Sequence, residues 1–256
     1  MKASSKLKLD QMVVKGNDLI QRAKSDLTVV ELKLISYVIS LIKPSDVEFQ
    51  KYDIKISDFS EIIGTSSNNI YKEFRRLIDS LDDKAFWIKI DNRYFKFRWF
   101  SESTYLVDKG KIQVVLNSQI KKYLIDLKNN FTSYELYNVM AMKSKYSIRL
   151  YEVMKSYAYR YTVEFDIEEL KTMLGASNYA KYKDFKNRVL LVAVNEINYY
   201  TDLQISYDHV DLYGNVMSET SRNKIAGLIF HISHKQPLEK YSAYLQVLDR
   251  LEKKKR

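Results

Sequence analysis

Apolar residues recur at helical spacing in two consecutive stretches between residues 163 and 200. The positions are Ile167, Leu170 and Leu174 in the first stretch, and Tyr182, Phe185, Val189 and Val192 in the second. The first helix is expected to end at Gly175, because glycine adopts the left-handed conformation that closes many helices. The second helix is expected over residues 178–190. This order of helix, glycine turn and helix predicts a helix-turn-helix.

The second of these helices has a basic outer face. Lys183 and Asn187 point directly away from the apolar face on a helical wheel, and Lys186 lies at its flank. A helix that lies against DNA presents positive side chains in this way. When the stretch is considered alone, charged residues that only solvate a surface helix are the simpler explanation.

An internal repeat favours the DNA-binding interpretation. Residues 52–81 align without gaps on residues 163–192, so that Gly64 corresponds to Gly175. The first copy therefore predicts another basic helix over residues 68–79. Its outward positions are Asn68, Asn69, Lys72 and Arg76, with Arg75 at the edge. Two copies of one DNA-binding-like unit in one chain are hard to explain as solvation.

Strand and cap signals complete the two units. Thr28 and Glu31 have the spacing of a capping box, which predicts a helix that begins after Thr28. Alternating residues predict β-hairpins over residues 86–100 and 105–116, and a hairpin directly after a recognition-type helix is the wing of a winged helix. The second unit is expected to open with a helix from Ser133. Its wing strands are expected at residues 203–207 and 225–232.

These patterns predict an α+β protein with two tandem winged-helix domains. The expected division is an N-terminal arm at residues 1–16, a first domain at 17–125, a second at 126–236, and a C-terminal helix with a basic tail at 237–256. The apolar positions of that last helix are Leu238, Tyr241, Tyr244, Leu245, Leu248 and Leu251. We expect this stripe to pack on the second domain, which leaves a membrane surface as the weaker explanation of the basic terminus.

Composition restricts the class of partner. The chain has 256 residues, a net charge of +10 and a pI near 9.3, which together indicate a polyanionic partner such as nucleic acid. Apolar residues make up 46% of the chain, enough for two globular cores. Cysteine is absent, so disulfides and thiolate-bound zinc are excluded and an intracellular location is expected. No apolar run reaches the roughly 18 residues of a membrane span.

The sequence gives no sign of catalysis. Nicking enzymes that start replication use a tyrosine nucleophile and a metal held by paired histidines, yet His231 and His234 have the wrong spacing for such a pair. There is no phosphate-binding glycine loop and no carboxylate cluster for two metals. We therefore expect no enzymatic activity, no catalytic residue, no metal and no cofactor.

Several motifs resemble one protein family. They include Arg149-Leu-Tyr-Glu152, the run from Phe165 to the Leu-Gly turn at Gly175, and Tyr182-Lys-Asp-Phe-Lys-Asn-Arg188. The chain is similar over about residues 12–236 to the RepB-type initiator replication proteins of iteron-controlled bacterial plasmids. Its first hairpin is long and aromatic, which leaves open whether its dimer edge matches that of the family.

The resemblance implies a function in plasmid DNA replication. Such proteins bind direct repeats, called iterons, at a plasmid origin, and the C-terminal domain usually makes the stronger base contacts. Monomers open the origin with the host replication initiator and the replicative helicase, whereas dimers repress their own gene. The resemblance thus implies double-stranded origin DNA as partner, a role in copy control and a bacterial cytoplasmic location. A winged-helix transcription regulator without a replication role is the alternative.

Each candidate DNA-binding residue has an expected role. Lys183, Lys186 and Arg188 in the second unit are expected to neutralise phosphates, and Lys72, Arg75 and Arg76 play the parallel roles in the first. The candidate base readers are Asn178, Tyr179 and Asn187. Lys181, Asn68 and Asn69 are further candidate DNA-binding residues. Arg188 lies partly toward the core side, so it could instead snorkel to the backbone. Arg222 and Lys224, in the loop between the wing strands, could reach a minor groove or a phosphate.

Overall fold

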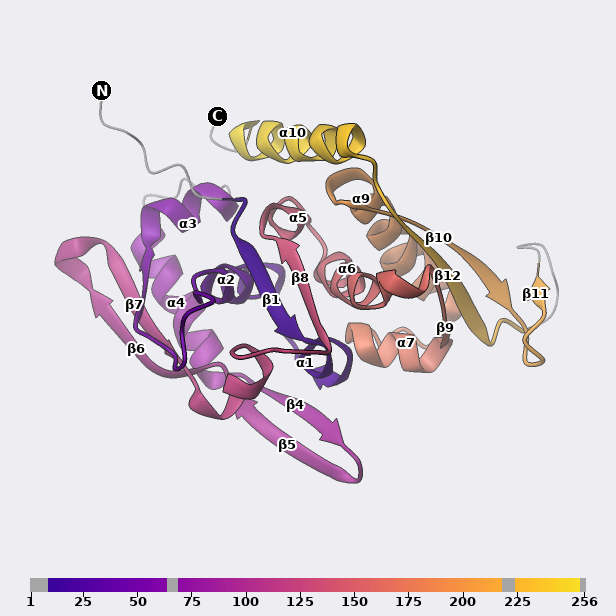
Figure 1. Ribbon diagram of the computed structural model, residues 1–256, viewed down its shortest axis with the longest axis horizontal. Coiled ribbons are helices and arrows are strands. Elements are labelled where there is room, and N and C mark those ends of the chain that lie inside the picture. The colour runs from indigo at the N-terminus through magenta and orange to yellow at the C-terminus, as the bar shows by residue number, and fades with distance from the viewer. Residues whose placement is uncertain (1–8, 64–68, 218–223, 254–256) are drawn as a thin grey trace.

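The computed structural model describes residues 9–63, 69–217 and 224–253. Figure 1 shows two units side by side, with helix α6 (Lys145–Tyr157) between them and helix α10 (Pro237–Lys253) across one end. Buried apolar residues from both units belong to one continuous cluster. The two units therefore share a core and have a fixed mutual orientation.

The first unit has the order of elements of a winged helix. Its elements are α2 (Val29–Ser40), β3 (Tyr52–Lys55), α3 (Ile56–Ile63), α4 (Ile70–Asp83), β6 (Phe100–Leu106) and β7 (Lys111–Leu116). The strands form an antiparallel sheet in the order β3-β7-β6. The capping box is confirmed: the Thr28 hydroxyl accepts from the Glu31 backbone N–H at 3.3 Å, and the Glu31 carboxylate accepts from the Thr28 N–H at 2.7 Å.

The second unit repeats this topology. Its elements are α6, β9 (Thr162–Asp166), α7 (Ile167–Leu174), α8 (Tyr182–Phe185), a π-helical turn (Lys186–Leu190), α9 (Leu191–Tyr200), β10 (Leu203–Val210), β11 (Val216–Met217) and β12 (Gly227–His234). The sheet order is β9-β12-β10, with β11 on the outer edge of β10. In both units the strand before the helix pair lies beside the last wing strand. The prediction of two tandem winged helices is confirmed.

The wing of the first unit was predicted from the wrong hairpin. Both hairpins form, but the one that directly follows α4, made of β4 (Ala85–Ile90) and β5 (Arg93–Arg98), pairs with β2 (Ala23–Lys24) in a separate sheet. The later hairpin β6–β7 completes the winged-helix sheet, because its return strand pairs with β3. The β4–β5 hairpin instead projects from the body of the protein (Figure 1).

A strand replaces the helix expected from Ser133. Residues Phe131–Glu135 form β8, which pairs antiparallel with β1 (Met12–Gly16), so that Val13 faces Tyr134. Phe131-Thr132-x-x-Glu135 has the same pattern as the capped helix start Leu27-Thr28-x-x-Glu31. Thr132 and Tyr134 are nevertheless buried from alternate positions of a strand, and this pairing with β1 outweighs the cap-like signal at Thr132. The predicted arm of residues 1–16 therefore includes one strand of the folded body. Short helices follow both strands: α1 (Asn17–Arg22) follows β1, and α5 (Tyr137–Met140) follows β8.

The C-terminal helix α10 buries part of the expected stripe. Leu251 is buried, and Tyr244 and Leu248 pack against the core, as predicted. Leu238, Tyr241 and Leu245 are exposed instead, while Ala243 and Val247 are buried. The helix contacts α9 and α5, and also α3 of the first unit. It therefore joins both units rather than covering the second alone. Short 3-10 turns lie at Val107–Lys109, Ser118–Tyr123 and Ala158–Arg160.

Candidate nucleic-acid interface

The turn before the second basic helix is built by local chemistry. The Asp166 carboxylate caps the start of α7 by accepting from the backbone N–H of Glu168 at 2.8 Å and of Glu169 at 3.1 Å. The helix ends at Gly175, whose φ of +68° is the left-handed conformation predicted for it. The counterpart Gly64 lies outside the described residues, so the repeat of this cap stays a prediction.

The helix that follows is anchored on its inner face by aromatic contacts. Phe185 and Val189 are fully buried, as predicted. Tyr182 is half-buried, and its hydroxyl lies 2.7 Å from Nε2 of the buried His209 on β10. Lys171 of α7 places its ammonium 5.8 Å from the centre of the Phe185 ring. These contacts fix the helix against α7 and the wing, so that its opposite face is turned outward.

A π-helical turn changes which residues this helix exposes. The turn at Lys186–Leu190 inserts one residue into the helical repeat, so the buried face shifts to Leu190, Ala193 and Ile197. Val192, predicted to be buried, is 39% exposed for this reason. Lys183, Asn187 and Arg188 are exposed, and Lys186 is half-buried.

The helix begins at Tyr182, later than the predicted start at residue 178. Lys181 is exposed at its N-cap position, while Asn178 and Tyr179 lie in the preceding turn. Asn178 is exposed, but Tyr179 packs edge-on against Tyr146 of α6 at a ring distance of 6.1 Å. Burial and the hydrogen bond with Tyr179 raise the pKa of Tyr146 to about 12. Tyr179 thus supports the turn, and its predicted role in base reading stays untested.

The first basic helix, α4, exposes its charged residues in the same way. Phe74 and Ile78 are buried beneath it, while Lys72, Arg75 and Arg76 are exposed. It begins at Ile70, with the exposed Asn69 at its N-cap, whereas Asn68 lies outside the described residues. The outward face predicted for this helix therefore matches the structure at every described position.

A groove of about 520 Å³ lies between α4 and the wing β6–β7. Arg75 lies over the Tyr105 ring at 5.3 Å, and the Tyr105 hydroxyl donates to the Arg75 carbonyl and to Asp79 Oδ1, both at 3.0 Å. Burial and the Asp79 carboxylate raise the pKa of Tyr105. Tyr71 and Lys111 also line this groove, and no sequence pattern marks them as site residues. An aromatic residue on the wing is indistinguishable in sequence from one in the core.

The turn of this wing requires its glycine. Gly110 has a φ of +59°, and a Cβ there would lie 3.1 Å from the Tyr71 hydroxyl. The wing of the first unit is thus held close to α4, where it can extend a DNA-contacting surface.

In the second wing, Lys224 is exposed next to the return strand, while Arg222 lies outside the described residues.

A buried ion network ties strands β1 and β8 to α6, the helix that lies between the two units. Lys15 Nζ of β1 donates to Glu152 Oε1 of α6 at 2.5 Å, and the Tyr134 hydroxyl of β8 donates to the same oxygen at 2.6 Å. Arg149 Nη1 lies 3.4 Å from Glu152 Oε2. Burial tends to raise the pKa of Glu152, but the charges of Lys15 and Arg149 outweigh it and hold the pKa below its ordinary value.

Arg149 also joins the units directly. Its Nη2 donates to the carbonyls of Ile20 at 2.9 Å and Ala23 at 3.2 Å in the first unit, and of Met173 at 3.3 Å in the second. One guanidinium therefore holds the end of α1 against the end of α7. The two basic helices are carried by one body in which their separation is set.

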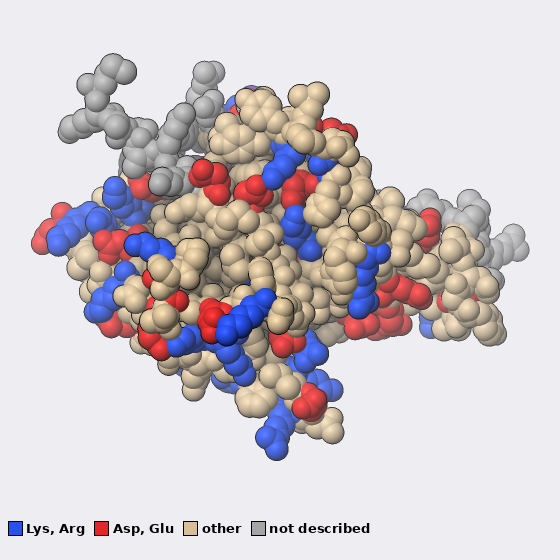
Figure 2. Space-filling view, viewed as in Figure 1, with Lys and Arg blue, Asp and Glu red and all other residues tan. Residues whose placement is uncertain are grey.

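The charged residues have no simple separation on the face shown in Figure 2, where basic and acidic side chains are interspersed. In the described part of the chain, no group of three or more His, Asp or Glu side chains is arranged to bind a metal ion. None of the described helices has the length and apolar character that crossing a bilayer requires.

Comparison with known protein families assigns the fold. The family described as "Initiator Replication protein, WH1" matches residues 12–155, and "Initiator Rep protein, WH2" matches residues 166–232. The chain belongs to the initiator replication protein family. The first match extends through most of α6, so the domain boundary predicted at residue 125 stays a prediction.

Individual relatives agree with this membership. A replication initiation protein of Escherichia coli is 25% identical over 211 residues, which are 77% of this chain and 65% of that protein. A 27.6 kDa protein of Escherichia coli is 25% identical over 162 residues, 61% of this chain and 67% of the relative. This initiator-family chain thus spans about two thirds of the length of these relatives.

The fold is also that of a solved initiator. The crystal structure of the Pi initiator protein in complex with iteron DNA matches with a TM-score of 0.72 and 16% sequence identity, over 90% of this chain and all of that chain. At this identity the likeness concerns the fold.

Proposed function

We propose that this protein initiates plasmid DNA replication by binding direct repeats in double-stranded DNA at an origin. The observation that carries the proposal is the duplicated winged helix, with one basic helix in each copy. Two winged helices with the same strand order present exposed basic residues on helices of one body. Membership of the initiator replication protein family and the likeness of the fold to a protein complexed with iteron DNA support the same function.

In this proposal α4 and the helix that begins at Tyr182 enter successive major grooves. Lys72, Arg75 and Arg76 in the first unit, and Lys181, Lys183, Lys186 and Arg188 in the second, neutralise phosphates. Asn187 is the base reader in the second unit, because its side chain is exposed beside those cations and an amide pairs with adenine. Residues of the first wing beside Tyr105 add contacts to the DNA phosphate backbone.

The proposed regulation follows the family. Monomers on the repeats open the origin together with the host initiator and the replicative helicase, in the bacterial cytoplasm, where plasmid DNA is replicated. Dimers repress the gene of the protein itself, which limits plasmid copy number. The protein acts by binding DNA and carries out no strand cleavage.

Footprinting on the DNA that flanks the gene tests this function. We expect protected sites that recur as direct repeats of about two helical turns, with one protomer bound to each. Combining Lys72→Ala with Lys183→Ala should abolish protection, while Lys128→Ala, which removes an exposed charge from the turn before β8, should leave it intact. A dimer bound to a single inverted repeat would instead make the protein a transcription regulator. Strand cleavage of the same DNA with Mg²⁺ would contradict the proposed absence of catalysis.

A further inference from the structure

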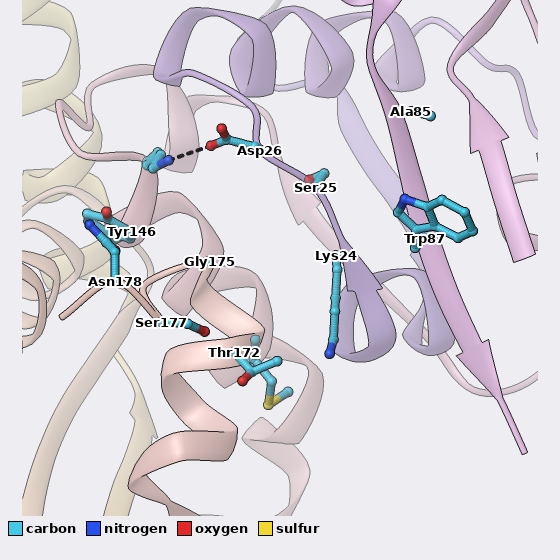
Figure 3. A pocket seen from close by; sticks show the side chains of 12 residues that line it. Lys24, Ser25, Asp26, Ala85, Trp87, Tyr146, Thr172, Gly175, Ser177 and Asn178 are labelled. Atoms are coloured by element: carbon cyan, nitrogen blue, oxygen red, sulfur yellow. Dashed lines mark hydrogen bonds and ion pairs between the residues drawn. The ribbon is translucent and has the colours of Figure 1, made fainter. Parts of the chain in front are cut away.

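A cleft of about 750 Å³ lies between the two winged helices, outside the two basic helices and the two wings. Its wall in the first unit includes Lys24 of β2 and Trp87 of β4, and its wall in the second includes Thr172 of α7, Ser177 and Asn178. In Figure 3 the Lys24 side chain extends into the space between Thr172 on one side and Trp87 on the other.

The cleft occupies the place where the two basic helices connect to the body. Ala85 lines it and follows the end of α4 at Asp83 by two residues. Ser177 and Asn178 line it from the turn that leads into α8. The cleft therefore adjoins the end of one basic helix and the start of the other, and a duplex that contacts both helices bridges this span.

The charge of the cleft is positive. Asp26 is the only acidic residue among its described lining residues, and its carboxylate is paired with Lys145 Nζ at 2.9 Å. The hydrogen bond and charge of Lys145 lower the pKa of Asp26, so that this pair stays ionised and neutral overall. Lys24 is exposed and has no ion pair with any residue in the described part of the chain. The Lys24 ammonium can therefore pair with an anionic ligand.

Other groups in the cleft suit a phosphodiester. Ser177 and Asn178 are exposed and offer a hydroxyl and an amide as neutral donors. Lys96 of β5 places its ammonium 5.4 Å from the centre of the Trp87 ring, which adds a second positive charge at the rim. Phosphate oxygens of DNA are the acceptors that such mixed charged and neutral donors bind.

The two walls are held in place before any ligand arrives. Arg149 donates to the carbonyl of Ala23, next to Lys24, and to the carbonyl of Met173, next to Thr172. The carbonyl oxygen of Ser25 also lies close to the α7 cap, 3.7 Å from the position that a Cβ on Gly175 would take. A preformed site binds with less loss of conformational entropy than one that must be ordered.

We propose that this cleft is a third contact site for duplex DNA, in which Lys24 binds a backbone phosphate between the two major grooves and Ser177 and Asn178 donate to the same phosphodiester. The inference rests on the proposed function, because it takes the ligand to be the duplex that both helices contact. It adds a contact in neither a recognition helix nor a wing, and one that depends on the spacing between the units.

The salt dependence of binding tests the cleft. Fluorescence anisotropy on a mixed-sequence duplex of about 30 base pairs gives the slope of log K against log salt for the wild type, Lys24→Ala and the control Lys128→Ala. We expect Lys24→Ala to reduce the slope by about 0.9 and to weaken binding roughly tenfold at 0.1 M salt, and Lys24→Arg to restore both. Lys128→Ala should match the wild type. Because Lys24 is exposed, all variants should share one melting temperature.

A second experiment locates the phosphate that Lys24 contacts on the DNA. Ethylation interference on a bound repeat should show one phosphate between the two major-groove footprints. Ethylation of this phosphate should weaken binding of the wild type and leave binding of Lys24→Ala unchanged. An unchanged slope for Lys24→Ala, or a loss seen only on a single-stranded oligonucleotide, would overturn the cleft proposal and leave the proposed function standing. A wild-type protein that binds no duplex would refute the proposed function itself, and the cleft proposal with it.

Discussion

Replacing Lys15 by methionine removes one charge from the buried network that ties strands β1 and β8 to α6. Lys15 is 5% exposed and its partner Glu152 is 1% exposed, so neither ion is hydrated. Removal of one partner from a buried pair costs about 3–5 kcal/mol. Glu152 keeps Arg149 and Tyr134, so we expect the lower end of that range, about 3 kcal/mol. A protein of this size loses about 2–4 °C in Tm per kcal/mol, which gives a decrease of roughly 6–12 °C.

The pH dependence of this deficit distinguishes the ion pair from simple packing. The pKa of Glu152 is depressed in the folded state, so its contribution is present above its ordinary pKa of 4.5 and is lost as the pH falls through the folded value. Lys15→Met should therefore be most destabilising near neutral pH and progressively less so below that pKa.

Differential scanning calorimetry on Lys15→Met and on the exposed control Lys128→Met measures both effects. A double-mutant cycle with Glu152→Gln adds a third test, because two contacting ions should lose less together than the sum of the single losses. Equal Tm values for Lys15→Met and its control at neutral pH, or strict additivity in the cycle, would refute the reasoning.

Three further substitutions test the second winged helix. Lys183→Ala should reduce the salt slope of binding by about 0.9 on every duplex, measured by anisotropy, and an unchanged slope would remove Lys183 from the interface. Asn187→Ala should relax the preference at one base position by about 1–3 kcal/mol in competition between single-base variants of a repeat, and an unchanged preference would exclude base reading. Gly175→Ala forces a side chain onto a φ of +68° and should destabilise the fold by more than about 1 kcal/mol in urea; no loss would contradict the strain at this cap.

The features that the sequence predicts well are those built from neighbouring residues. The capping box of Thr28 and Glu31, the left-handed cap at Gly175 and the turn of the β4–β5 hairpin depend on side chains a few positions apart. Asp91 in that turn has a φ of +53°, a conformation that Asp tolerates better than most residues. The repeat of a helix, a glycine turn and a basic helix in the sequence predicts the two winged helices.

Contacts between distant segments could not be predicted in the same way. The residues from Phe131 onward resemble the capped helix start at Leu27, yet they form a strand because Val13 and its neighbours supply a partner more than a hundred residues away. The choice between the two hairpins as the wing has the same cause. Only pairing of the return strand with β3 identifies β6–β7.

The exposure of side chains on the two basic helices could be predicted where the helix is regular and not where it is interrupted. On α4 a uniform helical wheel gives the exposed faces of Lys72 and Arg76 correctly. In the second unit, the π-helical turn shifts the wheel by one residue and exposes Val192. The interdomain role of Arg149 leaves no trace in spacing, because its carbonyl partners come from three separate segments.

The central claim is that one protomer contacts two successive major grooves with its two winged helices. Methylation interference at guanine N7 on a single repeat measures this directly, because N7 lies in the major groove. We predict two patches of interference about one helical turn apart, one for each basic helix. A single patch of interference on a repeat bound by one protomer would contradict the account.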